Sequence, residues 1–118
     1  MMYDMNTLTI TFLGSGYITV DLNAFFPCSK DKCRALISFI KDDYEHCGDL
    51  FNQLSTYFYR KMLTCQGKID FAEALPDLDL LRKESRAKLK WEGLMKLLPK
   101  EYRKEVSKNV EEATEQVL

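Results

Sequence analysis

The sequence has little net charge and no long hydrophobic run. Its 17 lysines and arginines nearly balance 18 aspartates and glutamates, which gives a formal net charge of −1. This balance excludes a globally basic nucleic-acid-binding protein and a globally acidic mimic of nucleic acid, but it allows local charged patches. No stretch approaches the roughly 20 apolar residues that span a membrane, and the N-terminus has no secretory signal. We therefore expect a cytoplasmic protein that does not enter the membrane.

Internal repeats, low-complexity tracts and Pro/Gly-rich linkers are missing as well. With 3 prolines and 5 glycines in 118 residues, nothing divides the chain, so we expect a single domain over residues 1–118. Catalytic and nucleotide-binding motifs are also missing. The segment Gly14-Ser15-Gly16 lacks the Lys-Ser/Thr pair of a phosphate-binding loop, so it predicts a turn. We therefore expect a protein that is not an enzyme.

Two short segments near the N-terminus alternate polar and apolar side chains, which is the pattern of half-buried β-strands. The first segment covers residues 7–13 and the second covers 17–22, so together they predict an antiparallel β-hairpin over 7–22. An isolated hairpin is only marginally stable in water, and its apolar face should therefore pack on helices. The side chains expected to face inward are Leu8, Ile10, Phe12, Ile18, Val20 and Leu22.

The apolar residues that follow recur every three or four positions, which predicts amphipathic helices over residues 29–117. Ser29 is a favourable N-cap for a first helix that should reach Cys47 and end at Gly48. Asp49 should cap a second helix that ends at Gly67. Because the two helices have similar lengths and a tight link, they predict an antiparallel αα-hairpin.

A connector over residues 68–76 should lead to a third helix from Asp77 to about Leu98. Pro99 is well suited to begin a fourth helix, whose apolar stripe is narrow. That stripe suits either a peripheral helix on the bundle or a seam with a second copy, so we expect a monomer or a homodimer. The stripe consists of Tyr102, Val106, Val110, Ala113 and Val117. The predicted fold class is α+β, an N-terminal antiparallel β-hairpin packed on an αα-hairpin and two further C-terminal helices.

All four cysteines and the only histidine lie between residues 28 and 65. Thiols stay reduced in the cytoplasm, which favours free thiols or metal ligands over disulfides. Zinc takes four Cys or His ligands in structural sites, and the αα-hairpin should bring both ends of the cysteine set together. We therefore predict a structural Zn²⁺ site at Cys28, Cys33, Cys65 and His46, with Cys47 as an alternative ligand.

Two other interpretations of the cysteines stay open. Cys33, Cys47 and Cys65 fall on apolar stripes, where a free cysteine behaves as a small hydrophobic residue. A reactive thiol is the third possibility. Cys33 and Cys47 would lie roughly 21 Å apart along a continuous helix, so both can bind one ion only if that helix breaks.

Residues 82–104 form a basic band that contains nine lysines and arginines and three glutamates. On a helix, Arg82, Arg86 and Lys90 lie at positions i, i+4 and i+8 and share one face. Together with Lys83 they are the candidate partner-binding residues. Such a face suits an acidic protein surface or the phosphates of nucleic acid.

The hairpin sequence TLTITFLGSGYITVDL, the cysteine-bearing helices and the charged C-terminal helices resemble the build of small type II-A anti-CRISPR proteins of phages and mobile elements. That family shares no motif, so the resemblance transfers no functional residue. It implies stoichiometric inhibition of Cas9 by binding to the surface of the protein. The expected function is a non-catalytic, protein-binding inhibitor, and the alternative is a small DNA-binding regulator that uses the basic helix over 82–104.

Overall fold

The computed structural model describes residues 6–12, 16–26, 28–43 and 46–105. Strand β1 (Thr7–Phe12) pairs antiparallel with β2 (Gly16–Asp21), which confirms the predicted β-hairpin. Leu8 and Ile10 of β1 are fully buried, as their alternation predicts. Ile18, directly opposite Ile10, is 41% exposed, because the helices cover the hairpin mainly along β1.

A short helix that the sequence did not predict, α1 (Leu22–Phe25), follows β2 directly. The carboxylate of Asp21 begins this helix by accepting hydrogen bonds from the backbone N–H groups of Asn23 and Ala24. Phe26 follows and is buried in the core. The segment between the predicted hairpin and the first predicted helix is therefore partly helical, and it places the ring of Phe26 against Tyr57, Phe58 and Trp91.

Helix α2 (Lys30–Lys41) begins at the predicted N-cap, where the Ser29 hydroxyl accepts a hydrogen bond from the N–H of Lys32. The helix ends at Lys41, and the predicted continuation to Cys47 is wrong. Asp43 explains the early end, because its buried carboxylate accepts hydrogen bonds from Thr11 of β1 and from the backbone N–H of His46.

Helix α3 (Cys47–Ala74) continues through Gly67, so the predicted end at that glycine is wrong. One glycine inside a helix costs only about 1 kcal/mol, and packing readily compensates for this. Ile69 and Ala72 beyond Gly67 are buried and extend the helix into the segment predicted as a connector.

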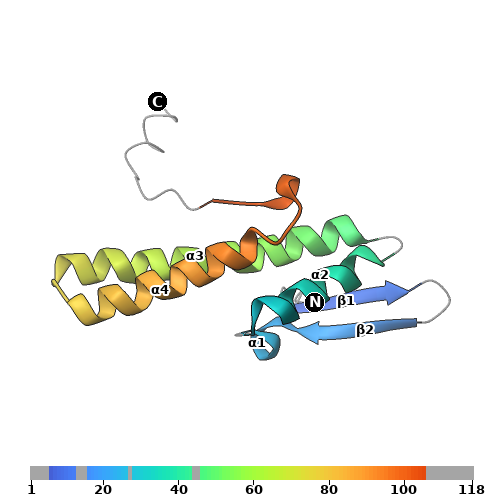
Figure 1. Cartoon of the computed structure of the whole chain (residues 1–118), viewed down its shortest axis with the longest axis horizontal. Coiled ribbons are helices and arrows are strands. Elements are labelled where there is room, and N and C mark those ends of the chain that lie inside the picture. The colour runs from blue at the N-terminus through green and yellow to red at the C-terminus, as the bar shows by residue number, and fades with distance from the viewer. Residues whose placement is uncertain (1–5, 13–15, 27, 44–45, 106–118) are drawn as a thin grey trace, which may run out of the picture.

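Helix α4 (Leu78–Met95) begins directly after Asp77, the predicted first residue, whose carboxylate accepts a hydrogen bond from the N–H of Leu80. It ends three residues before the predicted Leu98 and runs antiparallel to α3. Figure 1 shows the two helices side by side, with the hairpin, α1 and α2 gathered near one end of the pair. A short 3-10 helix, η1 (Lys100–Tyr102), and three non-helical residues follow, so the predicted fourth helix does not begin at Pro99. The remainder of that predicted helix lies outside the described residues. The α+β fold class is confirmed.

One cluster of buried apolar residues joins β1, α1, α2, the first half of α3 and the end of α4. Four aromatic rings form its centre, with Phe26 5.2 Å from Phe58 and 5.7 Å from both Tyr57 and Trp91 between ring centroids. Edge-to-face ring pairs add to the stability that burial provides. The core therefore lies at one end of the α3–α4 pair.

Candidate functional site

The candidate partner-binding residues all lie on the exposed surface of α4. Arg82, Lys83, Arg86 and Lys90 are exposed, and their helical spacing aligns them along one side. Within the part of the chain that the structure describes, Arg82, Lys83 and Arg86 make no ion pair or side-chain hydrogen bond. The ammonium group of Lys90 lies 5.6 Å from the ring centroid of Trp91. We call these four residues the basic ridge.

Other cations of the basic band are held by contacts inside the molecule. Lys88 is largely buried, donates a hydrogen bond to Gln66 of α3 and pairs with Glu92 at 3.7 Å. Arg103 donates to the backbone oxygen of Leu98, and Lys104 donates to the hydroxyl of Thr56. The basic band predicted from the sequence therefore contains two kinds of cation. Those of the basic ridge face solvent, whereas Lys88, Arg103 and Lys104 bind other groups of the same chain.

A buried carboxylate on α4 was missed by the sequence analysis. Glu84 is only 6% exposed and contacts Lys68 at 3.8 Å. Its position gives a signal that could have revealed it, because Leu80, Glu84 and Trp91 follow the spacing of the buried side of the helix. Since Glu84 faces α3, it does not neutralise the ridge on the opposite side of α4.

Cys28 and Cys33 lie at the start of α2, where Cys33 is fully buried. Burial raises the pKa of the Cys33 thiol to about 12, with a smaller contribution from Cys28. Burial also raises the pKa of Cys28, although Lys90 and Lys32 oppose the change. Both thiols therefore stay protonated near neutral pH, and protonated thiols are poor nucleophiles.

Cys65 lies on α3 outside the core cluster that contains Cys33. Burial raises the pKa of its thiol, and the charge of Glu84 and a hydrogen bond to that carboxylate raise it further. His46 is exposed and directly precedes α3, and Cys47 is the partly buried first residue of that helix. Among the residues with described positions, no three His, Cys, Asp or Glu side chains form a group that could hold a metal ion.

Zinc binding by the cysteines stays a prediction. Metal analysis of protein purified without a chelator tests it directly. About one zinc per chain, together with a lower melting temperature after EDTA, would support a structural site, because structural zinc binding is coupled to folding. Less than roughly 0.1 zinc per chain and unchanged melting would leave the buried-thiol interpretation.

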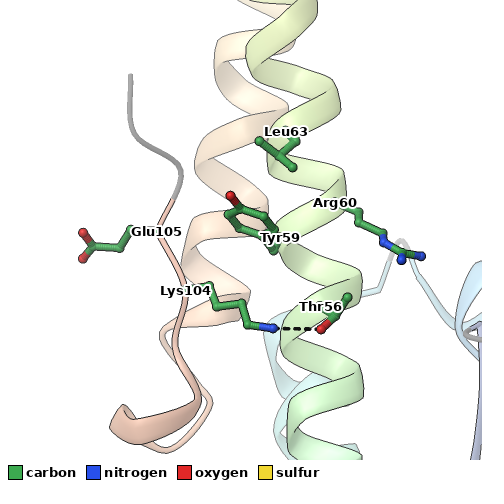
Figure 2. A pocket seen from close by; sticks show the side chains of 6 residues that line it. All are labelled: Thr56, Tyr59, Arg60, Leu63, Lys104 and Glu105. Carbon is green, nitrogen blue, oxygen red and sulfur yellow. Dashed lines mark hydrogen bonds between the residues drawn. The ribbon is translucent and has the colours of Figure 1, made fainter. Parts of the chain in front are cut away.

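A second surface feature lies on the outer side of α3, where the chain returns after η1. Figure 2 shows this open groove, of about 660 Å³, beside the segment that ends the described chain. A smaller hollow of about 370 Å³ continues from it between α3 and α4. The first is lined by Thr56, Tyr59, Arg60, Leu63, Lys104 and Glu105, and the second by Met62, Glu92, Met95, Lys96 and residues 103–105. Sequence reasoning did not find it, since it depends on where the chain folds back.

Comparisons of the chain with protein-family models, with curated proteins and with solved structures give no match. Across the described ranges, no helix combines the length and the apolar character needed to cross a membrane. The candidate site is therefore defined by the chain's own residues. These residues are the exposed cations of the basic ridge on α4 and the interior thiols whose pKa is raised by burial.

Proposed function

We propose that the protein is a non-catalytic inhibitor that binds an acidic protein surface through the basic ridge. The observation that carries the proposal is the exposure of Arg82, Lys83 and Arg86 along one side of α4, free of internal ion pairs among the described residues. Such cations are available to a partner, and electrostatic complementarity raises association rates and specificity. The protonated state of Cys28, Cys33 and Cys65 gives no support to a thiol-dependent enzyme.

A protein surface suits the ridge better than nucleic acid does. Leu89, 66% exposed, lies beside the cations, and an apolar side chain within a basic surface is typical of protein contacts. The one aromatic ring next to the ridge, Trp91, is partly buried among Phe26, Tyr57 and Phe58 and offers no stacking platform for bases. The predicted basic helix over 82–104 ends at Met95, so Arg103 and Lys104 lie outside it. The DNA-binding alternative also loses cations of residues 82–104, such as Lys88, that are bound to other groups of the same chain.

The resemblance to type II-A anti-CRISPR proteins makes Cas9 the first target to test. In a DNA-cleavage assay with a type II-A Cas9, we expect equimolar protein to inhibit cleavage. The double variant Arg82→Glu/Arg86→Glu should raise the concentration for half-inhibition at least about tenfold, because it places repulsive charges at the contact. The double variant Lys41→Glu/Lys100→Glu makes the same change of charge on other exposed residues and should inhibit as the parent does. Uninhibited cleavage at large excess would contradict Cas9 as the target.

A DNA-binding assay separates the two classes of partner. Nucleic-acid affinity falls steeply with salt because bound cations release counterions from the phosphates. We expect no fluorescence-anisotropy change with labelled duplex DNA at low salt. Binding that is strong at low salt, weakens with added salt and is lost in Arg82→Glu/Arg86→Glu would instead favour the DNA-binding regulator.

A further inference from the structure

The two edges of the β-hairpin differ in what binds them. On the outer edge of β1, the side chain of Gln53 donates a hydrogen bond of 2.8 Å to the backbone oxygen of Thr7, and Asp43 accepts one of 2.8 Å from the N–H of Thr11. Strand β2 forms the other edge, and Figure 1 shows it on the outer side of the hairpin, with β1 between it and α3. Among the described residues, no hydrogen bond from another element except β1 reaches the backbone of residues 16–20. The edge of β2 is therefore open.

The hydrogen bonds of the hairpin show which backbone groups point out of this edge. In an antiparallel pair, residues that bond to the facing strand alternate with residues that point away from it. Leu22 donates to the backbone oxygen of Asn6 across the hairpin, whereas the N–H of Thr11 points away from β2. Even-numbered residues of both strands therefore bond across the hairpin. It follows that the N–H and C=O groups of Tyr17 and Thr19 point outward from β2.

The open edge lacks the features that keep such edges from pairing. Natural sheets protect their edges with lysine, proline or a β-bulge. Residues 16–20 read Gly-Tyr-Ile-Thr-Val, without lysine, proline or any charge. The register between the paired residues of β1 and β2 is continuous, so none of them forms a bulge. The edge of β2 is therefore suited to pair with a further strand.

We propose that β2 pairs antiparallel with β2 of a second copy, so that the two hairpins form one continuous sheet about a two-fold axis. In this arrangement Ile18 lies opposite the partner's Ile18. Tyr17 and Thr19 then lie opposite the partner's Thr19 and the partner's Tyr17. Because the backbone groups of these residues point outward, each of the two pairs exchanges both of its N–H···O=C hydrogen bonds.

The edge is complementary to a second copy of itself. The ring of Tyr17, 68% exposed, would lie beside the partner's Thr19, and aromatic and β-branched side chains form favourable pairs across antiparallel strands. Ile18, 41% exposed, would be covered by the partner's Ile18 on the face that carries Leu8 and Ile10. Residues 16–20 carry no charge, so two copies do not repel each other there. A two-fold contact uses both open edges, and the assembly therefore closes at two copies.

Sedimentation equilibrium and amide exchange of the full chain test the proposal together. Two strands of six residues make a small contact, so we expect a weak dimer that forms between about 10 µM and 1 mM protein. Over this range, exchange measured by NMR should slow at least about twofold at the amides of Tyr17 and Thr19. The amide of Ile18 already bonds within the hairpin and should change less.

Two variants of the edge should keep the protein monomeric over the same range. Thr19→Pro removes an N–H that would donate to the partner, and proline is tolerated at an edge position whose N–H makes no bond inside the sheet. Ile18→Lys places like charges opposite each other across the two-fold axis. The matched control Leu63→Lys changes a similarly exposed apolar residue on α3, 45% exposed, and should dimerise as the parent does. Circular dichroism and thermal melting identify the variants that fold, and either folded edge variant is sufficient for the comparison.

A parent protein that stays monomeric up to about 1 mM would overturn the proposal. Association that persists in a folded edge variant would overturn it too, and so would concentration-dependent slowing that spares Tyr17 and Thr19, because the contact would then lie on another surface. No residue of the basic ridge takes part in this pairing. Failure of this proposal is therefore separate from failure of the proposed function, which is tested with variants of α4.

Discussion

The two ends of the α3–α4 pair differ in what covers them. At the end that carries the core, Leu54 and Phe58 are fully buried beneath the β-hairpin, α1 and α2. At the far end, Phe71, Leu75 and Leu78 are more than half exposed. The residues at both ends are comparably apolar. The difference shows that a third layer, and not the hydrophobicity of the pair, decides which end is a core and which is a surface.

A polar layer separates the two ends. Cys65 and Gln66 of α3 face Glu84 and Lys88 of α4 and are linked to them by hydrogen bonds. Lys68 adds an ion pair with Glu84. Among the described side chains, no buried polar atom lacks a hydrogen-bond partner, so this layer joins the helices without an unsatisfied group.

The largest expected difference between the ends concerns their aromatic residues. Phe58→Ala should lower the free energy of unfolding by about 3–5 kcal/mol, because it leaves a cavity among Phe26, Tyr57 and Trp91. Phe71→Ala at the far end should lower it by less than about 1 kcal/mol, since that ring is mostly in solvent. Urea denaturation of the two variants measures both values. Similar losses would mean that the far end is covered as well.

The next effect concerns the attachment of the hairpin to the core end. Asp43, 3% exposed, accepts hydrogen bonds from the backbone N–H of Thr11 at 2.8 Å and its hydroxyl at 3.0 Å. Asp43→Ala leaves these donors without their acceptor and should cost about 2–3 kcal/mol in the free energy of unfolding. The neighbouring Asp42 is exposed, and Asp42→Ala should change stability by less than about 0.5 kcal/mol. If Asp43→Ala lowered the free energy of unfolding as little as Asp42→Ala, the hydrogen bonds between Asp43 and Thr11 would contribute little to stability.

Alkaline pH should weaken the core end through Cys33. Its pKa is raised to about 12 in the folded protein from an ordinary value of 9.0, so above pH 9 the unfolded chain loses a proton that the folded chain keeps. The contribution to stability is complete below pH 9 and declines by up to about 1.4 kcal/mol per pH unit towards pH 12. Denaturation between pH 8 and 10.5 should show a steeper decline for the parent than for Cys33→Ala. Parallel curves would contradict this assignment, because the other titrations are common to both proteins.

The smallest effect lies towards the far end and has the opposite sign. Gly67 is exposed inside α3, and a Cβ added there meets no atom within 4 Å. Gly67→Ala should therefore raise the free energy of unfolding by about 0.5–1 kcal/mol. Gly48→Ala serves as the contrast, because its Cβ would lie 3.2 Å from the hydroxyl of Tyr102 and needs that side chain to move. A higher free energy of unfolding for Gly48→Ala, with no increase for Gly67→Ala, would contradict the contact at Gly48 and the open space at Gly67.

The sequence correctly predicted the features that depend only on residues close together in the chain. The alternation in β1, the Ser29 cap and the start of α4 at Asp77 depend on neighbouring residues, and the structure has them where the sequence places them. The predicted ends of α2 and α3 were wrong, because contacts with residues distant in sequence decide where these helices end. Asp43 ends α2 early through a bond to distant Thr11, and packing against α4 carries α3 past Gly67.

The candidate site was predictable to a similar extent. Exposure of the basic ridge follows from helical spacing, so Arg82, Arg86 and Lys90 lie as expected. The engagement of Lys88 and Lys104 could not be foreseen, because their partners come from α3, 22 and 48 residues away in sequence. The groove beside Leu63 could not be predicted either, because it forms where residues 104 and 105 fold back against α3.

Trp91, the only tryptophan in the chain, gives the molecule an optical reporter of its own. Its indole contacts the central rings of the core, and the ammonium group of Lys90, a residue of the basic ridge, lies 5.6 Å from its ring centroid. Fluorescence from this ring therefore responds to loss of the packed core and to a partner that draws Lys90 away. A single unlabelled spectrum could distinguish unfolding from binding, because the first exposes the indole to water and the second removes only a nearby charge.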